Sequence, residues 1–165
     1  MCDSCEEIEI AEGADGASGL YGGYCLKWKF DGASVAASPA SQFVRFNNTT
    51  YSSVTILYIN DTSSDSVNAQ AFLETWDDSG DATNRGYIRV AKEFDSSTYA
   101  MFKLTASVDS GTYHTMTATF ISSNGTFATN DAVVICFEPC GPVSTTPGPS
   151  GSQKYDTVPF TRDTP

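Results

Sequence analysis

The chain has 165 residues, enough for one domain with its own core, and a formal net charge of −11. Phosphate backbones and anionic membranes repel so acidic a surface, which disfavours nucleic acid and membranes as partners. No stretch is long and apolar enough to cross a bilayer, and the acidic start lacks the apolar segment of a signal peptide. We therefore expect synthesis in a cytoplasm.

Composition divides the chain into three parts. Residues 1–19 form an acidic N-terminal arm, in which glycine begins to recur at every third position from Gly13 to Gly22. This is the spacing of a collagen triple helix, and it hints at trimerisation. Residues 20–140 carry the pattern of successive strands and form the predicted β domain, whereas residues 141–165 form an arm rich in Pro, Ser and Thr that cannot build a core.

The central part is expected to consist of short strands separated by Gly, Ser, Asn and Asp. Strands are predicted at residues 24–30, 42–47, 54–61, 86–94, 99–108, 113–122 and 132–138. Residues 68–76 are rich in Ala, Leu and Glu and favour a short helix or a wide loop. Turn residues at 109–111 and 123–125 predict hairpins. The fold class is therefore all-β, an antiparallel sandwich or barrel-like domain of about seven or eight strands with extended terminal arms.

Six segments carry a pattern of strands and turns that points to one family. They are GADGASGLYGGYCLKW (13–28), TILYIND (55–61), LETWDDS (73–79), GYIRVAKE (86–93), AMFKLT (100–105) and DAVVICF (131–137). On these residues the chain resembles the small β-domains found beside collagen-like repeats in phage tail-fibre and virion-surface proteins. The resemblance implies a non-enzymatic, homotrimeric component of a tailed bacteriophage that is displayed on the virion surface.

Three departures from that family modify the expected function. The collagen-like part is short, a Pro-rich tail replaces the Gly repeat after Phe137, and a CxxC motif opens the N-terminal arm. Such a chain suits a capsid decoration (cement) protein whose arms bind the major capsid protein. The alternative is a short tail fibre or appendage that contacts tail proteins and binds a glycan receptor on the host.

Cysteine is the residue with the most chemical alternatives. Cys2 and Cys5 form a CxxC pair, Cys136 and Cys140 form a CxxxC pair, and Cys25 stands alone on the first predicted strand. We expect free thiols first and disulfides second. The third alternative is a zinc site built from the four thiolates of Cys2, Cys5, Cys136 and Cys140.

Two further groups of polar residues are candidate sites. Asp77, Asp78, Asp81 and Asn84 form an acidic loop whose oxygens suit calcium, although the loop lacks the spacing of an EF-hand. We expect a solvated loop, with calcium as the alternative cofactor. His114, the only histidine, is predicted on a strand as a surface or packing residue, because no nucleophile motif accompanies it. No catalytic residue is predicted.

Aromatic residues and Asn-x-Thr sequons are the remaining candidates for a role in binding or modification. Trp28, Trp76 and several tyrosines are expected to fill the core or an interface rather than to stack on sugars. The sequons at Asn48, Asn60 and Asn124 are interpreted as ordinary turn residues.

Overall fold

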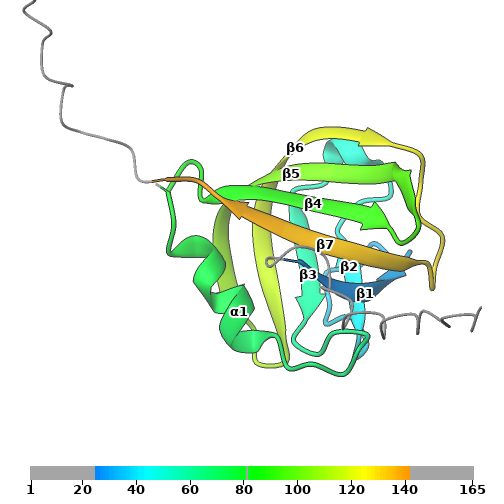
Figure 1. Cartoon of the computed structure of the whole chain (residues 1–165), viewed down its shortest axis with the longest axis horizontal. Coiled ribbons are helices and arrows are strands. Elements are labelled where there is room, and N and C mark those ends of the chain that lie inside the picture. Colours follow the sequence, from blue (N-terminus) through cyan, green and yellow to red (C-terminus); the bar gives the residue numbers. More distant parts are fainter. Residues whose placement is uncertain (1–24, 81, 142–165) are drawn as a thin grey trace, which may run out of the picture.

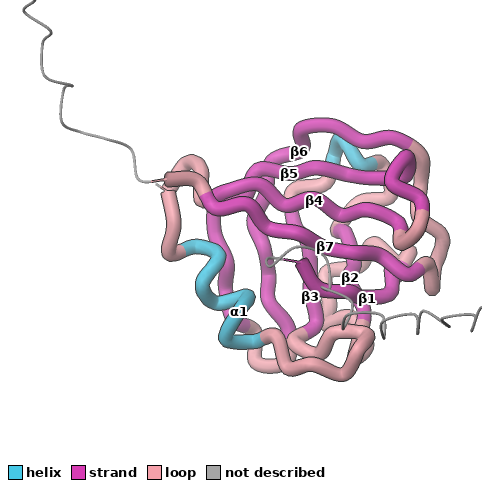
Figure 2. Tube along the Cα trace, in the orientation of Figure 1, coloured by secondary structure: helices cyan, strands magenta, loops and turns pink. Residues whose placement is uncertain are grey.

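Seven β-strands make up half of the chain that the computed structural model describes, residues 25–80 and 82–141 (Figures 1 and 2). The strands are β1 (Cys25–Asp31), β2 (Phe43–Phe46), β3 (Ile56–Asn60), β4 (Gly86–Lys92), β5 (Asp95–Asp109), β6 (Tyr113–Asn124) and β7 (Ala132–Pro139). A short helix α1 (Gln70–Glu74) and two 3₁₀ turns, η1 (Tyr51–Ser53) and η2 (Thr75–Asp77), complete the fold. The predicted N-terminal arm with its Gly repeat, and the C-terminal arm after Gly141, lie outside the described residues.

The strands close into a barrel in the order β1-β2-β3-β6-β5-β4-β7, with β7 paired back onto β1. This confirms the all-β fold class and selects the barrel over the sandwich. All neighbouring pairs are antiparallel except β1 and β2, which run parallel and are connected through the long segment 32–42. Parallel neighbours need such a crossover, because a tight turn can only join antiparallel strands.

The predicted strand positions are confirmed to within a few residues, and residues 68–76 contain α1 as expected. The predicted hairpin at 109–111 joins β5 to β6, which are paired. The hairpin predicted at 123–125 is wrong, because β6 pairs with β3 and β5 whereas β7 pairs with β1 and β4. Gly125, with a φ of 68°, instead starts a loop that leads from β6 to the other side of the barrel.

Inward-facing side chains fill the barrel. In β6 the buried residues His114, Met116 and Ala118 alternate with threonines, as the two-residue period of a strand requires. The largest apolar side chains with almost no exposure are Trp28, Phe46, Leu57, Ile59, Leu73, Trp76, Ile88, Phe102, Leu104, Met116 and Ile135. A barrel of this strand number is just wide enough for side chains to fill its interior.

Aromatic clusters close the two ends of the barrel. At one end α1 and η2 bring Trp76 onto Phe137, with ring centroids 4.8 Å apart and planes inclined by 10°. At the other end Phe46 packs edge-on against Phe30 at 5.1 Å and against Tyr51 at 5.4 Å. No helix in the described residues is long and apolar enough to cross a membrane.

Candidate functional site

A disulfide between Cys25 and Cys136 joins the first strand of the barrel to the last. The register of β1 and β7 places the two residues opposite each other. The expectation of free thiols is therefore wrong for Cys25 and Cys136, because barrel closure brings together two cysteines that are 111 residues apart. The disulfide also removes Cys136 from the predicted zinc set. Cys140 is a free, partly buried thiol, and Cys2 and Cys5 lie outside the described residues.

The acidic loop after α1 directs its side chains to separate partners. Asp77 Oδ2 accepts a hydrogen bond from the backbone N–H of Ser107 at 3.4 Å. Asn84 Nδ2 donates to the hydroxyl of Tyr87 at 3.3 Å. Asp81 lies outside the described residues. The loop thus supports β5 and β4 through at least two of its polar side chains.

His114 makes the most buried polar contact among the functional candidates. The side chain is inside the barrel, 1% exposed, near the end that α1 covers. Its Nδ1 lies 2.8 Å from Oδ1 of Asp61, the residue that follows β3. The register of β3 and β6, which pairs Ile59 with His114, brings these two residues together. The sequence predicted both residues on strands, at 54–61 and 113–122, but it did not indicate that these strands are neighbours.

Asp109 extends this pair into a cluster. One nitrogen of His114 and one carboxylate oxygen each of Asp61 and Asp109 lie within 4.8 Å of one another. The N–H of Gly111 donates to Asp109 Oδ1 at 2.7 Å, and Gln70 Nε2 donates to Oδ2 at 3.2 Å. The bond from Gly111, followed by that from Gln70, holds the pKa of the Asp109 carboxyl below its ordinary value. Asp109 is therefore an anion at neutral pH.

A polar pocket of about 410 Å³ opens beside this cluster. It is lined by Ser41, Asn60, Asp61, Thr62, Ser66, Asn68, Gln70, Gly111 and Thr112. All of its lining side chains carry hydroxyl, amide or carboxylate groups, and none is aromatic. Such a lining suits a hydrated or charged ligand better than an apolar one.

The cluster lacks the arrangement of a nucleophilic triad. In a triad the second histidine nitrogen contacts a serine or cysteine, while the carboxylate orients the first. Nε2 of His114 is buried and has no hydrogen-bond partner in the described part of the chain. The Asp61–His114 pair can orient the ring but places no nucleophile on it.

Two sequons and the tryptophans have structural roles. Asn60 is 6% exposed, accepts hydrogen bonds from the N–H groups of Gln42 and Thr62, and donates to the carbonyl of Thr112. Asn124 donates to the carbonyl of Ser97. Trp28 and Trp76 are fully buried, which confirms their prediction as core residues.

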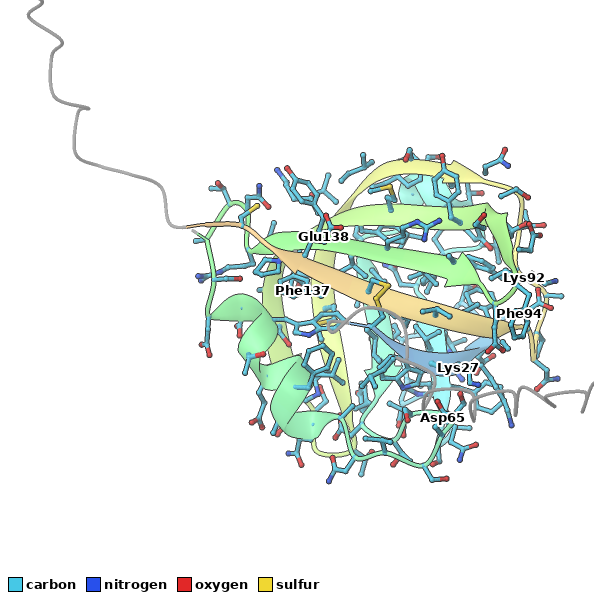
Figure 3. All side chains as sticks on the ribbon, in the orientation of Figure 1. Lys27, Asp65, Lys92, Phe94, Phe137 and Glu138 are labelled. Atoms are coloured by element: carbon cyan, nitrogen blue, oxygen red, sulfur yellow. A yellow bond between two sulfur atoms is a disulfide. The ribbon has the colours of Figure 1, made fainter. Side chains whose placement is uncertain are left out.

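The outward side chains of β1, β7, β4 and β5, together with the β4–β5 turn, form a second candidate, which we call the outer face (Figure 3). Strand register aligns its residues in rows. One row runs across all four strands through Cys25, Cys136, Arg89 and Met101. The next row contains Lys27, Val134, Ala91 and Tyr99.

Two shallow grooves of about 390 and 470 Å³ hollow the outer face. They share Arg89 and Cys136, so they lie next to each other along β4 and β7. Phe94 lies at the end of the second groove, at the β4–β5 turn, and is 98% exposed. In Figure 3 Phe94 and Glu138 mark opposite ends of this surface, with the disulfide between them.

Charged residues on the outer face are held in place by neighbours. The guanidinium of Arg89 lies 5.7 Å from the centre of the Tyr99 ring. Lys27 Nζ lies 3.2 Å from Glu93 and 3.3 Å from Asp65. The bond to Glu93 is the main reason that the pKa of Lys27 is raised above its ordinary value, although burial opposes it. The outer face thus combines apolar surface with ordered charges.

Comparisons with protein-family models, with curated proteins and with solved structures found no match to this chain.

Proposed function

We propose that this chain is a non-enzymatic structural protein of a bacteriophage virion, a decoration protein that binds the outside of the capsid and stabilises it. The exposed Phe94 beside the grooved outer face is the observation that carries the proposal. A phenylalanine with nearly its whole side chain in water contributes nothing to its own core. Aromatic residues beside grooves are typical anchors of protein–protein interfaces.

The conformation of Phe94 adds to this argument. Its φ is 60°, in the left-handed region that bulky residues rarely adopt, where glycine is the ordinary choice. Folding alone gives no reason for phenylalanine at a turn that favours glycine. A binding role for the aromatic side chain supplies that reason.

The disulfide supports a location outside the cell. Disulfides form and persist in oxidising surroundings and are rare in the cytosol. A virion protein is made in the host cytoplasm but works after release, where the Cys25–Cys136 bond is stable. Synthesis in the cytoplasm followed by release is therefore compatible with the disulfide.

The proposal includes a homotrimer, which the resemblance implies and which light scattering tests through the mass of three chains. Many copies of one weak contact together give strong attachment when symmetry repeats them on a shell.

A second candidate function is a short tail appendage that binds a host glycan. The polar pocket favours it, because hydroxyl and amide groups line that pocket.

Substitution of Phe94 tests the proposal through binding to capsids of the parent phage assembled without this protein. We expect Phe94→Asp to bind at least about 30-fold more weakly than the natural chain, since an anchoring aromatic contributes about 2 kcal/mol or more. Ile121→Asp is the matched control, because Ile121 is 45% exposed and lies on β6, which does not contribute to the outer face. Equal binding of the natural chain and the two variants would count against the outer face as the docking surface.

A further inference from the structure

The Asp61–Asp109–His114 cluster has no part in the proposed docking surface. It lies at the α1 end of the barrel, where β3 and β5 end and β6 begins. Asp61 is 8% exposed and His114 is 1% exposed, whereas Asp109 is on the surface. Two buried polar groups are thus grouped with an exposed carboxylate that faces solvent. The cluster therefore extends from the barrel interior to the solvent.

The distances within the cluster suit a small cation. A tetrahedral zinc ion with ligands about 2.0–2.1 Å away holds neighbouring ligand atoms roughly 3.3 Å apart. The His114 nitrogen and the Asp61 oxygen are 2.8 Å apart, so they need to separate by a few tenths of an ångström to admit the ion. The three ligand atoms already lie within 4.8 Å of one another. Asp109 is exposed, so its side chain has room to complete the approach.

The ligand types narrow the choice of metal. Imidazole together with carboxylate suits Zn²⁺ and its transition-metal neighbours, whereas Ca²⁺ and Mg²⁺ prefer oxygen ligands alone. The buried ring of His114 faces Asp61 with Nδ1, so Nδ1 is the ring nitrogen positioned to bind the ion. The neighbouring polar pocket gives the ion a route from solvent and space for water as a further ligand.

We propose that Asp61, Asp109 and His114 form a binding site for a divalent transition-metal ion of the Zn²⁺ type. The ion is coordinated by one ring nitrogen and two carboxylates and ties together the ends of β3, β5 and β6. This site shares no residue with the predicted zinc set of Cys2, Cys5, Cys136 and Cys140. It is also independent of the outer face, so either proposal can fail without the other.

The single histidine makes the test direct. The tag-free full chain is labelled with ¹⁵N-histidine and titrated with ZnCl₂, in a background of Cys2→Ser, Cys5→Ser and Cys140→Ser that removes the thiols outside the disulfide. We expect the ring ¹⁵N signals of His114 to shift and to saturate at one zinc per chain. Native mass spectrometry of the same sample checks the stoichiometry.

Two variants decide whether the cluster binds the metal. Asp109→Asn is expected to weaken zinc binding at least about tenfold, because even the loss of a residue that only orients a ligand costs about that much. Asp95→Asn is the matched control, since Asp95 also accepts hydrogen bonds from its own turn but lies outside the cluster. The zinc affinity of this variant is expected to stay within about twofold of that of the unsubstituted background. Circular dichroism verifies that both variants are folded. Unchanged His114 signals in zinc, or equal weakening by the two variants, would overturn the proposal.

Discussion

Removal of the Cys25–Cys136 disulfide is expected to lower the free energy of unfolding by about 2–5 kcal/mol. The bond closes a loop of 111 residues, and the loss of chain entropy in the unfolded state grows with loop length. It also connects β1 to β7, the pair that closes the barrel. For a domain whose total free energy of unfolding is about 5–15 kcal/mol, this loss is a large share.

Urea denaturation of the Cys25→Ser, Cys136→Ser double variant measures this loss. Cys140→Ser is the control, because Cys140 is a free thiol and its substitution is expected to change the unfolding free energy little. If the double variant were as stable as the control, the disulfide would have no role in holding the barrel closed.

Truncation of Phe46 to alanine is expected to cost about 3–5 kcal/mol, the usual range for a buried phenylalanine. Phe46 is 2% exposed, and its ring lies within 5.4 Å of the rings of Phe30, Tyr51 and Phe102. These neighbours belong to different elements, so they cannot close around the cavity together.

Phe94→Ala is the matched comparison, since the same atoms are removed from a side chain that is 98% exposed. Its unfolding free energy is expected to stay within about 0.5 kcal/mol of the natural chain. Denaturation midpoints of the two variants give the contrast. A similar loss in both would mean that the aromatic cluster does not form the end of the core.

The strands could be predicted from the sequence because their signal is local. Residues 113–122 alternate polar and apolar side chains and residues 132–138 form a short apolar run, and the observed β6 and β7 cover both ranges. The period of two follows from the geometry of an extended chain and needs no knowledge of its neighbours. The short helix before Trp76 was indicated by composition for the same reason.

The contacts that make the candidate sites could not be predicted, because they depend on which strands are neighbours. Turn residues at 123–125 suggested a hairpin, yet β6 and β7 are not paired. The approach of Cys25 to Cys136 and of His114 to Asp61 follows from barrel closure and strand register. The exposure of Phe94 likewise follows from a turn whose geometry the sequence pattern did not specify.

The copy number of this protein in purified virions, relative to the major capsid protein, tests the proposed function most directly. Quantitative mass spectrometry with isotope-labelled peptides supplies the ratio. A decoration protein is expected in a number comparable to that of the capsid subunits, as repetition over the shell requires. A few copies per particle would instead indicate a location on the tail. Absence of the protein from the particle would contradict the virion assignment.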